Sequence, residues 1–121
     1  MITYAFLDEI KKNFPLILSQ KLTGPVDIDD MAVDYNASLE SQLIKQLTLL
    51  QSKTSLFSEA CRCNDEVTMK AFLLEIRTHA MSLSSFFDAI AEDATLLIRI
   101  DGWPDIPENY QVPEHYNYPK R

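Results

Sequence analysis

The sequence predicts an all-α protein: a three- or four-helix antiparallel bundle built on a long helical hairpin, with an extended C-terminal tail rich in proline and tyrosine. The chain of 121 residues contains only two glycines, so it lacks the residues that tight β-turns and phosphate-binding loops need. Apolar residues recur at alternating spacings of three and four, which is the period of an amphipathic helix. Four of the six prolines fall in the last 21 residues.

The strongest helical pattern lies between Asn64 and Arg99, with no proline or glycine to interrupt it. We expect Asn64 to cap this helix and Gly102 and Pro104 to end it, which gives about 35 residues and a length of roughly 50 Å. Three serines weaken the apolar pattern within 82–85, where a break in the helix is possible on sequence grounds. The seam consists of Met69, Leu73, Ile76, Ala80, Leu83, Phe87, Ile90, Ala94 and Leu97.

A second amphipathic helix precedes it and begins somewhere between Asp29 and Ser38. Helices joined by a short connection are antiparallel neighbours, so a bend at Cys63 and Asn64 places residue i opposite about 127 minus i. Asp34 is then expected near Asp93. The apolar stripe of this helix consists of Leu39, Leu43, Leu47, Leu50, Thr54, Phe57 and Cys61.

Residues 3–22 carry enough apolar side chains for a third helical element against the hairpin. Pro15 is expected to kink this element or to begin a second short helix, because an interior proline costs about 3 kcal/mol. Residues 1–102 are therefore assigned to one helical domain.

The tail, residues 103–121, alternates apolar and polar side chains from Tyr110 to Tyr118, which is the period of an extended strand. One interpretation is that it runs back along the bundle and covers a groove. The other is that it is a recognition segment, in which Trp103, Tyr110 and Tyr116 anchor a partner and the prolines hold the chain extended.

The net charge of −7 is unevenly placed. Residues 25–40 contain five acidic and no basic residues, and residues 88–114 contain seven acidic residues against Arg99 alone. The hairpin brings these stretches together at the pole opposite the bend, where they favour docking on a basic partner; solubility is the alternative explanation. The acidic candidates for partner binding are Asp27, Asp29, Asp30, Asp34, Asp88, Glu92 and Asp93.

No motif assigns a catalytic residue, a cofactor or a metal. Residues 27–38 have acidic spacing suggestive of a calcium loop, but Ala32 replaces its glycine and Ser38 its final glutamate. Cys61 and Cys63 offer two thiols where zinc needs four ligands, and His79 lies about 24 Å further along the helix.

We therefore expect a small, soluble, non-enzymatic protein that binds another protein. An inhibitor or immunity-type protein that covers the basic site of a nuclease toxin or a nucleic-acid-handling protein fits the size and charge. The alternatives are a self-assembling helical adaptor, which forms a homodimer through the heptad seam, and a carboxylate-based enzyme or metal protein. Scattered basic residues argue against direct nucleic-acid binding, and the lack of a signal peptide or apolar span predicts a cytoplasmic location away from membranes.

Overall fold

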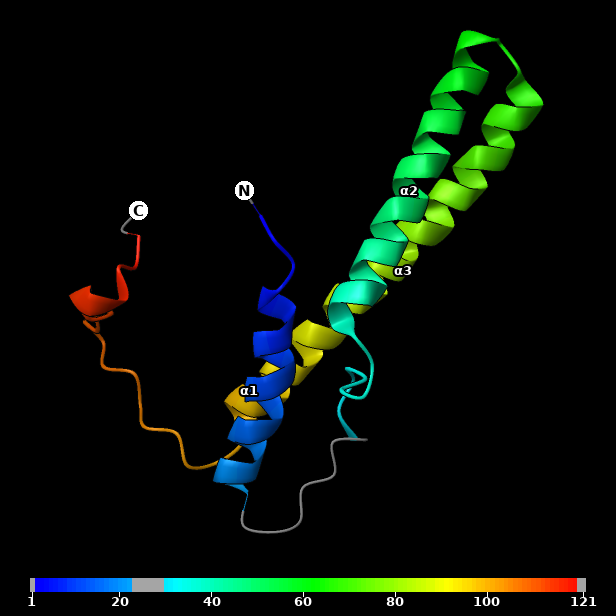
Figure 1. Ribbon diagram of the computed structural model, residues 1–121. Helices are drawn as coiled ribbons and strands as arrows, with labels where there is room; N and C mark the ends of the chain where they lie inside the picture. The colour runs from blue at the N-terminus through cyan, green and yellow to red at the C-terminus, as the bar shows by residue number, and fades with distance from the viewer. Residues whose placement is uncertain (1, 23–29, 120–121) are drawn as a thin grey trace.

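The computed structural model describes residues 2–22 and 30–119, and it confirms the all-α class. Three helices follow one another along the chain: α1 (Phe6–Lys21), α2 (Leu39–Arg62) and α3 (Glu66–Arg99). A short 3₁₀ turn, η2 (Glu114–Tyr116), lies in the tail, and the described ranges contain no strand. Figure 1 shows α2 and α3 side by side as a long hairpin, with α1 against its lower end.

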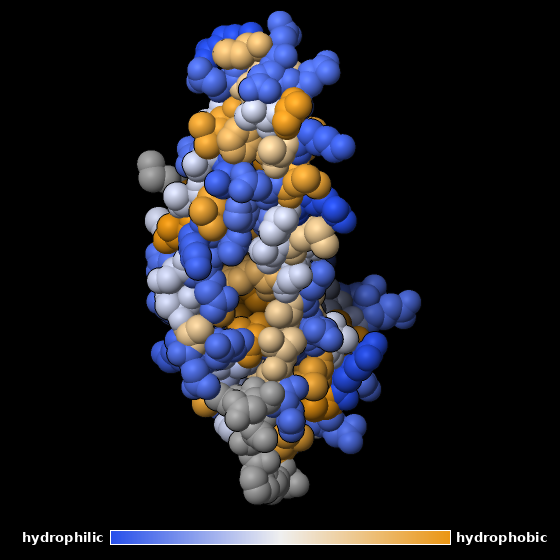
Figure 2. Space-filling model, turned by 90° about the vertical axis from the view of Figure 1, so that its right-hand side faces the viewer, coloured by the Kyte–Doolittle hydropathy of each residue, from blue (hydrophilic) through white to orange (hydrophobic). Residues whose placement is uncertain are grey.

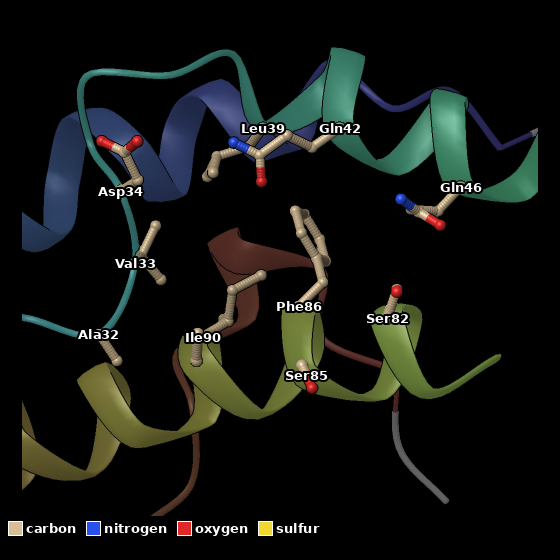
Figure 3. A pocket seen from close by; sticks show the side chains of 11 residues that line it. Ala32, Val33, Asp34, Leu39, Gln42, Gln46, Ser82, Ser85, Phe86 and Ile90 are labelled. Atoms are coloured by element: carbon tan, nitrogen blue, oxygen red, sulfur yellow. The ribbon is translucent and has the colours of Figure 1, made fainter. Parts of the chain in front are cut away.

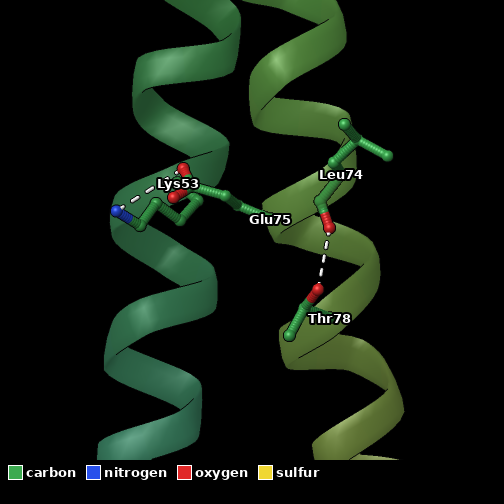
Figure 4. Close-up of polar contacts among 4 residues, drawn as sticks. All are labelled: Lys53, Leu74, Glu75 and Thr78. Carbon is green, nitrogen blue, oxygen red and sulfur yellow. Dashed lines mark hydrogen bonds and ion pairs between the residues drawn. The ribbon is translucent and has the colours of Figure 1, made fainter.

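The antiparallel register of the hairpin agrees with the sequence prediction. Lys53 Nζ lies 3.6 Å from Glu75 Oε2 in the outer half (Figure 4). At the lower end, the Val33 backbone N–H donates to Asp93 Oδ2 at 2.9 Å. Both pairs deviate by only one position from the predicted pairing. The position of the bend and the helical spacing therefore predict the register of the hairpin to within one residue.

The bend shows why one predicted cap is wrong. Asn64 has a φ of 54°, and the Asp65 N–H donates to Ala60 O at 3.0 Å, which closes the end of α2 in the way a left-handed residue allows. The N-cap of α3 is Asp65, whose carboxylate accepts bonds from the Thr68 N–H at 3.2 Å and hydroxyl at 2.7 Å. These bonds lower the pKa of the Asp65 carboxyl.

The buried seam of α3 keeps part of the predicted seam and shifts the rest by one residue. Ile76, Leu83 and Ile90 are half-buried and Leu97 is buried, as predicted. Leu73 and Phe87 are about half exposed, at 50% and 49%, whereas Phe72 and Phe86, one residue earlier, are half-buried. Large apolar residues stand side by side at both places, so the spacing alone did not distinguish the two seams. The helix continues through 82–85 without a break.

The hydrophobic core sits at the lower end of the hairpin, where α1 and the loop before α2 pack onto it. α1 is one helix that includes Pro15, so the proline does not start a second helix. Ser38 caps α2, at the last position of the predicted range. The core contains Leu7, Leu18, Met31, Val33, Tyr35, Leu39, Leu43 and Leu97.

Among the described residues, none forms a third layer on the outer half of the hairpin. Between residues 44 and 82, Ala60 is the one buried residue. The whole chain exposes 9606 Å², about 2900 Å² more than a compact monomer of its mass, and the exposed tail contributes to this excess together with the outer half. Figure 2 shows apolar side chains interspersed with polar ones along one side of the hairpin.

The tail does not lie along the bundle. Every described residue from Asp101 to Pro119 is exposed, and Figure 1 shows the tail projecting away from the helices. Its start is held by Trp103, whose Nε1–H donates to Leu97 O at 2.7 Å, and by Lys21, whose Nζ lies 4.6 Å from the indole centroid. The covering role suggested by the sequence is therefore not seen in the described tail.

Candidate functional site

Asp93, predicted as a docking residue, is buried with 2% of its surface exposed. Its carboxylate accepts three hydrogen bonds: from the backbone N–H of Ala32 at 2.7 Å, from that of Val33 at 2.9 Å, and from the Tyr35 hydroxyl at 2.9 Å. These bonds satisfy a buried acid that would otherwise be costly. Asp93 therefore fixes the loop before α2 to α3, and it is not on the surface that a partner would contact.

The hydrogen bond between Tyr35 and Asp93 makes the stability of the protein depend on pH. Burial, the hydrogen bond to Asp93 and the negative charge of Asp93 together raise the pKa of the Tyr35 hydroxyl above its ordinary value of 10.0. The Tyr35 hydroxyl therefore loses its proton at a lower pH in the unfolded chain than in the native chain. Its contribution to the free energy of unfolding is fully present below pH 10 and is lost as the pH rises through the native pKa.

We expect tyrosinate absorbance to show one of the five tyrosines ionising later than the others and together with unfolding. Tyr35→Phe is expected to remove that late step and to make the free energy of unfolding fall less steeply above pH 10. Tyr110→Phe is the control, because Tyr110 is exposed. Equal titrations of the two variants would contradict the assignment.

A groove of about 300 Å³ lies between the loop, α2 and α3. Figure 3 shows Phe86 and Ile90 pointing from α3 towards α2, and Gln42 and Gln46 facing them. Of the described residues, Asp34, on the loop, is the one acidic residue that lines it. An apolar floor with a few polar groups at its edge is typical of a binding site. The lining residues are Ala32, Val33, Asp34, Leu39, Gln42, Gln46, Ser82, Ser85, Phe86, Ala89 and Ile90.

Exposed carboxylates surround the lower end of the hairpin, and we call this surface the acidic base. It consists of Asp30, Asp34, Asp88 and Glu92, which are all exposed. The two ion pairs between described residues, Lys53–Glu75 and Arg62–Glu59, both lie in the outer half, so the acidic base has no cationic partner within the described chain. Asp27 and Asp29 lie outside the described residues.

The predicted aromatic anchors are separate from the acidic base. Tyr110 and Tyr116 are 54% and 66% exposed, and Trp103 is 44% exposed. In Figure 1 the tail lies on the other side of α1 from the loop that carries Asp34. The two predicted docking regions are therefore not one continuous surface.

The described part of the chain has no cluster of three or more His, Cys, Asp or Glu side chains able to hold a metal ion. In the same part, no helix combines the length and the apolarity that crossing a membrane requires. The described lining of the groove offers amides, hydroxyls and one carboxylate, whereas acid–base chemistry without histidine uses a pair of carboxylates. What these residues can do directly is recognise a side chain by shape, hydrogen bonding and charge.

The chain matches no protein-family model, no curated protein and no solved structure. Sequence reasoning missed the groove, and its one signal was the break in the apolar pattern at 82–85. Ser82 and Ser85 line the groove there, and their small side chains leave the space that larger residues would fill.

Proposed function

We propose that this chain is a non-enzymatic protein-binding protein of the inhibitor or immunity type. It docks its acidic base on a basic partner, such as a nuclease toxin or another nucleic-acid-handling protein. The observation that carries this proposal is a set of exposed carboxylates without ion pairs among the described residues, of which Asp34 lies at the edge of a groove with an apolar floor.

The groove suits a lysine or arginine side chain of the partner. The aliphatic part of such a side chain packs on Phe86 and Ile90, and its charged end reaches the Asp34 carboxylate at the edge. The side-chain oxygens of Gln42 and Gln46 accept the remaining hydrogen bonds. One inserted basic side chain therefore uses the apolar floor, the amides and the carboxylate of the groove.

The remaining acidic residues act at longer range. Asp88 and Glu92 are exposed and four positions apart on α3, so they share one face of the helix. Their field accelerates encounter with a basic surface and disfavours acidic partners. The proposal includes the cytoplasm as the site of action, where the exposed free thiols of Cys61 and Cys63 would stay reduced.

Reversing three charges of the acidic base tests the proposal. The Asp34→Lys/Asp88→Lys/Glu92→Lys variant is expected to capture at least about tenfold less of a basic partner from native lysate. The loss should be large at about 50 mM salt and small at about 500 mM, where the wild-type protein also binds weakly because salt screens exposed charges. The captured proteins are identified and quantified by mass spectrometry.

The matched control reverses three acids of the outer half, Glu59, Glu66 and Glu75, and changes the net charge by the same amount. It should retain the partner, because these acids lie away from the groove. Equal loss in both variants would show that net charge alone drives binding, and equal retention would exclude the acidic base as the docking surface.

A further inference from the structure

The exposed tail contains two copies of a six-residue unit. Residues 107–112 read Pro-Glu-Asn-Tyr-Gln-Val, and residues 113–118 read Pro-Glu-His-Tyr-Asn-Tyr. The copies share proline, glutamate and tyrosine at their first, second and fourth positions, and a carboxamide side chain at the fifth. A further proline, Pro119, follows the second copy in the same way that Pro113 follows the first. We call these copies the first and second tail units.

Both tail units form the same backbone turn. The Tyr110 N–H donates to Pro107 O at 3.0 Å, and the Tyr116 N–H donates to Pro113 O at 3.1 Å. Each bond joins the first residue of the unit to the fourth and closes a β-turn. The second turn continues into η2 through one further bond, donated by the Asn117 N–H at 2.9 Å. The shared sequence therefore gives a shared geometry in a segment whose described residues are all exposed.

The side chains that the units share are available for binding. Tyr110 and Tyr116 are 54% and 66% exposed, and Glu108 and Glu114 are exposed as well. A segment that serves only as a linker or a solubilising tail is poor in aromatic residues. A tyrosine buries a large area at a low cost in side-chain entropy. The turn lowers the entropy cost of binding further, because it fixes the backbone before contact.

We propose that the tail binds one protein through both units, and that this protein has two equivalent pockets related by translation. Each pocket takes a tyrosine ring between apolar side chains, and a lysine or arginine at its edge pairs with the glutamate two positions earlier in the tail. The charge of the tail fits such pockets, since residues 103–119 contain three acidic residues and no lysine or arginine. The tail lies apart from the acidic base, so this binding is additional to the proposed function.

The spacing of the units determines how the two pockets are arranged. Equivalent residues of the units are six positions apart, which is at most about 20 Å along an extended chain. The units run in the same direction, and only Gln111 and Val112 separate the tyrosine of the first from the proline of the second. Pockets related by a two-fold axis would need one unit reversed, which so short a connection prevents. Consecutive repeats of a repeat protein provide equal pockets in the same direction, so a repeat protein fits the tail.

Photo-crosslinking of the full chain in native lysate tests this arrangement. A benzophenone amino acid replaces Asn109 in one protein and His115 in another, because the units differ at this third position and both residues are exposed. Mass spectrometry then locates the crosslinked residues. Both proteins are expected to crosslink to the same repeat protein, at equivalent positions of two of its repeats. Crosslinks at one and the same position, at unrelated positions or to no protein would overturn the proposal.

Titration of the crosslinked protein, once purified, shows whether both units contribute to one binding event. Tyr110→Ala and Tyr116→Ala should each raise the dissociation constant at least about tenfold, and the double variant at least about 100-fold, because two linked contacts reinforce each other. If the units instead competed for a single pocket, each single variant would weaken binding only about twofold. That result would overturn the two-pocket arrangement.

Two controls accompany the titration. Tyr118→Ala removes a tyrosine that is 65% exposed but stands at the sixth position, where the first unit has valine, and it should change the dissociation constant less than about twofold. An equal loss in Tyr118→Ala would show that the apolar character of the tail, and not the repeated turn, drives binding. The Asp34→Lys/Asp88→Lys/Glu92→Lys variant should bind as the wild type does, which separates this proposal from that of the acidic base.

Discussion

Asp93→Ala is expected to lower the free energy of unfolding by about 3 kcal/mol or more. The substitution removes the acceptor for two backbone N–H groups, of Ala32 and Val33, and for the Tyr35 hydroxyl. All three groups belong to the loop whose side chains enter the core at Met31, Val33 and Tyr35. The methyl group of alanine cannot replace these bonds, so the loop should detach from α3.

Chemical denaturation followed by circular dichroism measures this loss, and hydrogen exchange locates it. Exchange at Val33 should accelerate more than exchange in the outer half of α3, because the loop opens before the hairpin does. Asp88→Ala is the control, an exposed acid on the same helix, and it should change the stability by less than about 0.5 kcal/mol. Similar losses in both variants would contradict the structural role of Asp93.

Asp93→Ala is also expected to affect the groove between the loop, α2 and α3. Val33 and Asp34 line one side of the groove, and Asp93 holds Val33 in place. Asp93 therefore positions the groove without contacting a ligand in it. Tyr35→Phe removes only one of the three bonds and should cost about 1 kcal/mol while leaving the loop in place.

The hairpin was predictable because its determinants are local. Helical spacing and one bend fix the register, and Lys53 and Glu75 are found within one position of it. The rotation of α3 was not predictable, because Phe72 and Leu73 are equally apolar and only contact with α2 selects between them. The choice of Asn64 as cap failed for a similar reason: asparagine suits both an N-cap and a left-handed turn, and the adjacent Asp65 takes the cap.

The acidic base was predictable in part. Charge and register together located Asp34 and Asp88 at one pole, but charge alone could not show that Asp93 points inward. The predicted seam ran through Ala94, which is the neighbour of Asp93. The apolar pattern therefore gave no sign that Asp93 is buried. A helical seam that starts at Phe72, with spacings of four and three, also contains His79, Phe86 and Asp93. Its polar residues, His79 and Asp93, make it a poor candidate for a buried face on hydrophobicity alone.

Leu7→Ala is expected to cost about 3 to 4 kcal/mol, which is the usual range for a fully enclosed leucine. Leu7 has 0% of its surface exposed, and it belongs to α1, which is the one described helix that packs on the lower end of the hairpin. The cavity would sit between α1 and the hairpin. Leu18 is the one further buried residue of α1, and Ile10, Phe14 and Ile17 are only half-buried against the core. We therefore expect α1 to separate before the hairpin unfolds.

Denaturation with limited proteolysis distinguishes this result from a uniform loss of stability. Cleavage of Leu7→Ala should occur first within α1 and leave the hairpin intact, because α2 and α3 contact each other along their length. Leu16→Ala is the control on the same helix, since Leu16 is 45% exposed, and it should cost less than about 1 kcal/mol. If Leu7→Ala instead unfolds the whole chain in one step, then α1 and the hairpin form a single cooperative unit. The stability of the outer half of the hairpin would then depend on the core at the lower end.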